Sequence, residues 1–102
     1  MHLVQLLLPL AREQGPRFER ALFESLEREL TDRFGGLTAY PRAPATGLWE
    51  EDPGHTIREQ MVVYEVMVER LEPSWWAMLR RRLEQQFEQD ELVVRAQEIQ
   101  RL

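Results

Sequence analysis

The chain has 102 residues, of which 43% are hydrophobic and 30% charged, and its formal net charge is -5. These values are typical of one folded domain, so we expect a single domain over residues 1–102 and no disordered region. The acidic balance argues against a nucleic-acid partner, because binding to phosphates needs a basic surface.

The first two predicted elements are a strand and a helix. Residues 3–10 form a near-continuous apolar run, which is typical of a strand buried on both faces. The run is too short for a membrane span and lacks a basic leader and cleavage site, so we expect a cytoplasmic protein without a membrane partner. Residues 17–34 carry apolar side chains every three or four positions, which predicts an amphipathic helix ended by Gly35-Gly36.

The middle of the chain predicts strands of unequal quality. Residues 37–40 begin a second strand, but residues 41–56 contain prolines and glycines that a central strand excludes. We interpret this part as an edge strand interrupted by a loop, with residues 46–49 returning to strand. Residues 57–70 are rich in β-branched side chains and contain no glycine or proline, so they give the strongest strand signal.

A second helix is predicted from Ser74, after Pro73, to about Gln89, and a last strand over residues 92–99. The resulting order, β-α-β-β-α-β, predicts an α+β fold of the ferredoxin-like type. Such a fold has a four-stranded antiparallel sheet with two helices on one face and strands one and three in the centre. The two most apolar strands are the first and the third, which agrees with this topology.

Two adjacent tryptophans, Trp75 and Trp76, precede three adjacent arginines at positions 80–82. A helical wheel places both indoles beside the line of Leu79 and Leu83. This spacing predicts that both indoles pack in the core while the arginines border the solvent. The alternative is that Trp75 overhangs the end of the sheet and lines a pocket or a subunit contact.

The sheet face without helices is predicted to be apolar as well, because Met61, Val63 and Met67 alternate with the core-facing residues of the third strand. An uncovered apolar face of this size predicts association, and we expect a homodimer that pairs sheet against sheet. The alternative is that the 41–56 loop covers this face through Leu48 and Trp49.

The residue types present restrict the possible chemistry. The chain has no cysteine and no lysine, which excludes disulfides, thiolate nucleophiles, Schiff bases and a P-loop. Its two histidines, His2 and His55, are not at metal-ligand spacing, so we predict neither a metal site nor another cofactor.

The remaining candidates for a site are ionisable and aromatic residues around the third strand. Glu65 lies between Val63 and Met67, where a carboxylate with a raised pKa would act as a base; the alternative is an ion pair with Arg95. The candidates for proton transfer are His55, Glu59 and Glu65. The candidates for ligand binding are Tyr40, Trp49, Arg58, Tyr64 and Trp75.

Two hypotheses about function follow from these observations. The first is an oligomeric α+β domain without catalytic activity, which binds a small ligand or a protein partner. The second is a cofactor-free oxygenase or isomerase of the dimeric α/β-barrel type, with a substrate cleft between helices and sheet; it rests on the fold class alone. A solid core between helices and sheet would count against the second hypothesis.

Four short stretches, "GLTAY", "GLW", "IRE" and "RRRLEQQFEQDELVV", carry a resemblance to a known family. They resemble the GLT, G-x-W, R-E and F-x-Q pattern of an uncharacterised bacterial family of small proteins with a domain of unknown function. The matching positions are Gly36, Leu37, Thr38, Gly47, Trp49, Arg58, Glu59, Phe87 and Gln89. The resemblance implies a ferredoxin-like domain and no known activity.

Overall fold

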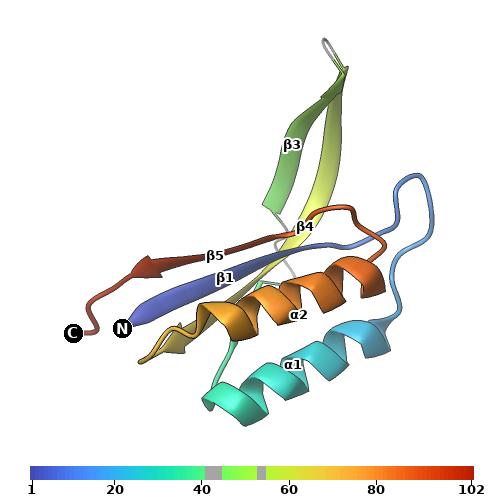
Figure 1. Cartoon of the computed structure of the whole chain (residues 1–102). Helices are drawn as coiled ribbons and strands as arrows, with labels where there is room; N and C mark the ends of the chain where they lie inside the picture. Colours follow the sequence, from blue (N-terminus) through green and yellow to red (C-terminus); the bar gives the residue numbers. More distant parts are fainter. Residues whose placement is uncertain (41–44, 53–54) are drawn as a thin grey trace.

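The structure is a computed structural model that describes the backbone of residues 1–40, 45–52 and 55–102, and the side chains of residues 1–40 and 60–102. The described chain forms five strands and two helices, with three consecutive strands between the helices (Figure 1). In order they are β1 His2–Pro9, α1 Arg20–Phe34, β2 Thr38–Ala39, β3 Ala45–Asp52, β4 His55–Val68, α2 Pro73–Gln86 and β5 Val93–Glu98.

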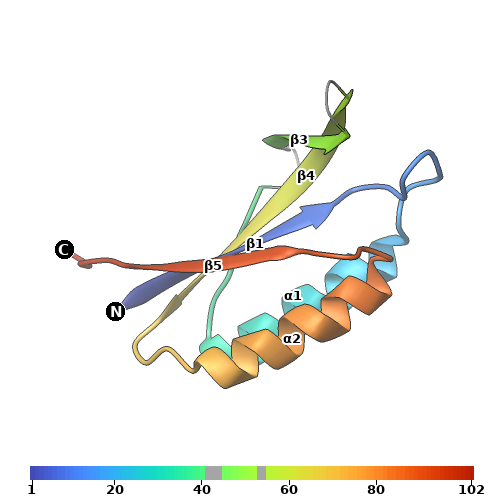
Figure 2. The same cartoon turned by 45° about the horizontal axis from the view of Figure 1, so that its top comes forward.

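The sheet is antiparallel, and its strand order is β2-β4-β1-β5. Strands β4 and β1 are therefore central, as the sequence predicts. Both helices lie on one face of this sheet (Figure 2), so the predicted α+β, ferredoxin-like arrangement is confirmed. Within residues 1–40, 45–52 and 55–102, the opposite face carries no helix.

Strands β2 and β3 follow the same edge of β4 one after the other. Thr38 is paired with Glu65, and Ala45 is paired with Met61. The predicted interrupted edge strand is thus confirmed, with residues 41–44 and 53–54 outside the described part of the chain. The predicted return to strand at residues 46–49 lies within β3, which is longer than predicted. The start of β4 was predicted at Ile57, two residues late, because pairing with β3 extends the ladder of β4 to His55.

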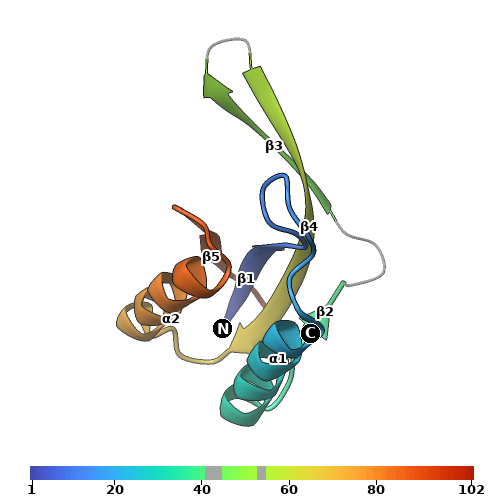
Figure 3. The ribbon, with the colours of Figure 1, turned by 90° about the vertical axis from the view of Figure 1, so that its right-hand side faces the viewer.

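The β3–β4 hairpin projects past the end of β1, whose Pro9 is paired with Met61 (Figure 3). Residues 55–59 of β4 therefore pair with β3, beyond the end of β1, whereas Gln60 O also accepts a hydrogen bond from Leu10 N–H at 3.2 Å. The backbone of the hairpin does not fold back over the β1–β5 half of the sheet, in contrast to the alternative of a covering loop.

The hydrophobic core fills the space between the sheet and the two helices. Alternate residues of β1 and β4 point into it, while their neighbours point to the helix-free face. The buried apolar residues are Val4, Leu6, Leu8, Phe18, Leu26, Leu30, Val62, Tyr64, Val66, Val68, Trp76, Leu79, Leu83, Phe87 and Leu92. No polar or charged residue of the described part is buried with them.

Both helices are shorter than predicted, for local reasons. Helix α1 begins at Arg20 instead of residue 17, because Phe18 N–H donates to Leu10 O at 3.0 Å and ties this segment to the end of β1. It ends at Gly35, whose φ of 82° is a left-handed conformation that glycine adopts without strain. Helix α2 ends at Gln86, three residues before the predicted end, and the chain turns at Glu88 with a φ of 52°.

The two tryptophans pack as the first interpretation predicts. Trp76 is 5% exposed and stacks on Phe34 of α1, with ring centroids 5.1 Å apart and planes 11° apart. Trp75 is half-buried and meets Phe34 edge-on at 5.3 Å. The Arg33 guanidinium lies 4.2 Å from the Trp75 ring centroid, and Arg33 also pairs with Glu72 at 2.9 Å. The tryptophans thus join the ends of the two helices.

Replacing Leu83 by Ala should lower the free energy of unfolding by about 2–5 kcal/mol, because Leu83 is fully buried and its loss leaves a cavity. Urea denaturation followed by circular dichroism measures this change. The matched control is Met78→Ala on the same helix, where the side chain is 60% exposed and the expected change is within about 0.5 kcal/mol. Equal losses in both variants would contradict the described packing of α2.

Tyr64 links the sheet to α1 and gives a pH-dependent prediction. Burial, followed by the hydrogen bond that its hydroxyl donates to Glu27, raises the pKa of Tyr64 far above its usual range. The retained proton therefore stabilises the fold fully below pH of about 10, and this stabilisation is lost as the pH rises further.

The chain has two tyrosines, so Tyr40→Phe leaves Tyr64 as the single phenol. In this variant, phenolate absorbance should appear only when alkaline pH also removes the helical circular dichroism. Phenolate formation near pH of about 10 in a fully folded protein would refute the buried hydrogen bond.

Candidate functional site

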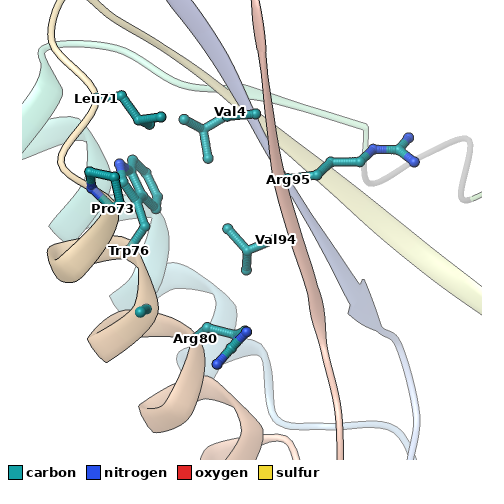
Figure 4. A pocket seen from close by; sticks show the side chains of 9 residues that line it. Val4, Leu71, Pro73, Trp76, Arg80, Val94 and Arg95 are labelled. Carbon is teal, nitrogen blue, oxygen red and sulfur yellow. The ribbon is translucent and has the colours of Figure 1, made fainter.

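A pocket of about 220 Å³ lies between α2 and the edge strand β5 (Figure 4). Most of its wall is apolar, and one aromatic and one cationic side chain join it from α2. The lining residues are Val4, Leu71, Pro73, Trp76, Ala77, Arg80, Val94, Arg95 and Ala96.

The sheet register explains why residues far apart in sequence line this pocket. Val4 is paired with Ala96, and all three lining positions Val4, Val94 and Ala96 belong to the alternation that faces the helices. On the other wall, Trp76 is held in place by its stack on Phe34. The pocket is therefore built on rigid elements at one edge of the core.

Arg80 is the charged side chain that reaches into the pocket (Figure 4). Its Nε atom is buried and has no hydrogen-bond partner among the described residues. The nearest carboxylate oxygen, Oε2 of Glu84, is 3.8 Å from it. That oxygen already accepts a hydrogen bond from Leu92 N–H at 3.0 Å, so Glu84 holds the start of β5 and does not hydrogen-bond to Arg80.

The backbone of β5 is open at the pocket. Ile99 N–H donates to Met1 O at 2.9 Å, so Ile99 and every second residue before it direct their backbone groups to β1. Val94 and Ala96 therefore direct their N–H and C=O groups away from the sheet, at its free edge. Figure 4 shows the Arg95 side chain pointing away from the pocket, so Arg95 contributes backbone there.

The helix-free face carries a row of polar side chains that runs from Tyr40, just after β2, across β4 and β1 to β5. Tyr40 donates to Glu65 Oε1 at 2.8 Å, and Gln5 donates to Glu65 Oε2 at 2.6 Å. Arg95 Nε in turn donates to Gln5 Oε1 at 2.8 Å. The hydrogen bond from Tyr40 to Glu65, together with the negative charge of Glu65, raises the pKa of the Tyr40 phenol.

Apolar residues flank this polar row on both sides. Leu3 and Met67 are paired on one side of it, and Leu7 is paired with Val63 and with Val93 on the other. Met67 is 50% exposed and Val93 is 47% exposed, while the others are half-buried. The helix-free face therefore presents an amphipathic surface, which is more polar than the mostly apolar one expected.

The predicted site residues fall into three groups. Tyr40 and Glu65 are brought together, but on the helix-free face. Glu65 reaches Arg95 through Gln5 and not by a direct ion pair. Tyr64 is a core residue, and Trp75 lies between the helices; neither lines the pocket.

The third group lies on the projecting hairpin. It comprises Trp49 on β3 and His55, Arg58 and Glu59 on β4, and the side chains of all four are outside the described residues. Their backbones pair across the hairpin, for example Trp49 with Ile57. Their proposed roles in ligand binding and proton transfer remain predictions.

Sequence reasoning missed the pocket residues on α2, namely Pro73, Trp76, Ala77 and Arg80. The helical wheel correctly placed Trp76 on the buried side of the helix and Arg80 at the border of that side. This spacing is the sequence signal for a cation next to an indole. The partner wall cannot be read from the sequence, because it depends on which strand lies beside α2.

The described residues form neither a metal-binding cluster nor a membrane-spanning helix. No group of three or more histidine, aspartate or glutamate residues in this part of the chain could hold a metal ion. None of the helices there is long and apolar enough to cross a membrane.

No protein-family model and no curated protein matches the chain. Two solved structures share its fold. A phage SAM lyase in complex with S-methyl-5'-thioadenosine superposes with a TM-score of 0.67 and 17% sequence identity, over 95% of this chain and 80% of that chain. A phage SAM lyase in the apo state gives a TM-score of 0.62 and 14% identity, over 94% and 78% of the two chains. At these identities the likeness establishes the α+β fold.

Proposed function

We propose that this chain is a small-molecule-binding domain and that its ligand occupies the pocket between α2 and β5. The observation that carries the proposal is the pocket itself, an apolar hollow of about 220 Å³ with an indole and a guanidinium on one wall. Few, well-placed polar groups in an apolar wall are typical of small-molecule sites.

The fold comparison supplies the first ligands to test. One of the two similar structures is a SAM lyase bound to S-methyl-5'-thioadenosine, a purine nucleoside thioether. We therefore propose SAM and S-methyl-5'-thioadenosine as trial ligands for this chain. The support is likeness of fold, which leaves the site and the chemistry to experiment.

A catalytic cleft between helices and sheet is not part of this proposal. The residues in that layer, among them Leu6, Leu30, Leu83 and Phe87, are fully buried and pack against one another. The second hypothesis of the sequence, an oxygenase or isomerase, requires open volume there. The described residues fill the centre of that layer, so binding at the edge of the sheet is the better-supported function.

We also propose that the chain forms a homodimer through its helix-free face, with Met61, Val63 and Met67 in the contact. The observation behind this second proposal is that the two charged residues of the polar row, Glu65 and Arg95, have opposite signs. Glu65 lies on one side of Gln5 and Arg95 lies on the other, each one strand away.

A twofold axis parallel to β1 would stack two such faces with matching charges. It would place Arg95 of one copy over Glu65 of the other, and Leu7 over Leu7, with the two sheets about 10 Å apart. Arg95 is exposed, and its contact with Gln5 uses Nε, which leaves its terminal nitrogens for such a pair.

The pocket proposal predicts that a larger side chain in the pocket weakens ligand binding. Ala77→Phe puts a ring into the pocket and should weaken binding of S-methyl-5'-thioadenosine or SAM by at least about tenfold, because the ring and the ligand compete for one volume. Isothermal titration calorimetry measures the affinity. Ala21→Phe, on the exposed side of α1, is the matched control and should bind as the unchanged protein does. If Ala77→Phe binds normally, the ligand lies elsewhere.

The dimer proposal predicts a charge-swap result, which native mass spectrometry can read. Glu65→Arg and Arg95→Glu should each give monomers, because like charges then face each other, at a cost of several kcal/mol. An equimolar mixture of the two variants should form heterodimers, since both cross-pairs are then opposite in sign. Arg81→Glu, on the exposed side of α2, is the control and should leave the dimer intact. A monomeric unchanged protein would contradict the proposal.

A further inference from the structure

We propose that the pocket between α2 and β5 takes a small organic monoanion, namely a carboxylate with an apolar body whose carboxylate group binds Arg80. This inference rests on the proposed ligand-binding function and specifies the chemical class of the ligand. It is independent of the nucleoside trial ligands, because it follows from the pocket wall alone.

The charge of the ligand follows from the state of Arg80. A buried N–H without a hydrogen-bond partner is costly, and buried donors in folded proteins are nearly always satisfied. Arg80 Nε is such a donor, since Glu84 is 3.8 Å away and engaged with Leu92 N–H. A carboxylate in the pocket would accept from Nε and a terminal nitrogen together, in the paired geometry that guanidinium groups favour.

The body of the ligand follows from the rest of the wall. Between Arg80 at one end and Leu71 at the other, the lining is formed by Val4, Trp76 and Ala77 with other apolar groups. Such a wall offers no side-chain partner for a polar body. An aryl or alkyl group would bury its surface against Trp76 and displace water from apolar atoms.

The edge of β5 offers a second set of contacts to this ligand. Val94 lies near the Arg80 end of the pocket, and its N–H and C=O point off the free edge of the sheet, as do those of Ala96. Beyond Val4 on the same face of β1, His2 has a buried Nδ1 without a partner among the described residues. Unused backbone groups of β5 thus border the apolar wall near Arg80.

A monoanion fits this wall better than a phosphate dianion. One guanidinium is available, and the Glu84 carboxylate lies 3.8 Å from it. A second negative charge on the ligand would meet Glu84 in a chain whose net charge is already -5. A carboxylate carries one charge and is planar, which matches both the charge and the geometry of Arg80.

The test is a titration of the full chain with two probes that differ in charge and hardly in shape: 3-phenylpropionate and 3-phenylpropionamide. Proton–nitrogen correlation spectra report the affinity and the residues affected. We expect the carboxylate to bind at least about tenfold more tightly than the amide, since a charge-assisted hydrogen bond replaces a neutral one. Shifts should centre on the backbone signals of Ala77, Val94 and Ala96.

Two arginine variants separate a pocket contact from general electrostatics. Arg80→Gln should remove the preference for the carboxylate, whereas Arg81→Gln, one residue along on the exposed face, should retain it. Both variants lower the positive charge of α2 by the same amount. Phenyl phosphate should bind more weakly than the carboxylate; tighter binding would overturn the assignment of a monoanion.

Failure of this inference can be told from failure of the proposed function. If neither phenyl probe causes shifts at the pocket, or if Arg80→Gln keeps the preference, the carboxylate class is wrong. If S-methyl-5'-thioadenosine nevertheless binds and Ala77→Phe blocks it, the pocket remains the ligand site. If Ala77→Phe blocks no ligand at all, the proposed function fails as well.

Discussion

The antiparallel pairing of β1 with β4 is the constraint on which the rest of the structure depends. Its register runs without a break from His2 opposite Val68 to Pro9 opposite Met61. Because side chains alternate between the faces of a sheet, this register decides at once which residues enter the core. A shift of β1 by one residue would turn Leu6 to the helix-free face and bring Gln5 into the apolar layer beneath the helices.

Each face of these two strands has its own consequence. On the helix side the apolar residues make a filled layer with α1 and α2, reinforced by the Phe34 stack on Trp76 and by the hydrogen bond from Tyr64 to Glu27. On the other side, Gln5 links Glu65 to Arg95 between flanking apolar residues. The first face provides stability, and the second is the surface on which a second copy of the chain is proposed to pack.

The pocket arises where the filled layer meets the free edge of the sheet. Strand β5 has a neighbour on one side only, and α2 lies below it, so the space between them is covered less completely than the centre. Arg80 borders this space because it follows Leu79 and Trp76 on the edge of the buried arc of α2. The proposed small-molecule site therefore lies at the edge of the core, outside its packed centre.

The sequence by itself determined the element order, the helix-bearing topology, the central place of the two apolar strands and the burial of Trp76. Periodicity reports which side of an element is apolar, and these properties need nothing more. Only the tertiary structure decided that Tyr40 and Glu65 meet on the helix-free face, that Gln5 stands between Glu65 and Arg95, and that Arg80 faces β5. These contacts join residues 25 to 90 positions apart or depend on which strand lies beside a helix, so they follow from register and packing, which local patterns do not encode.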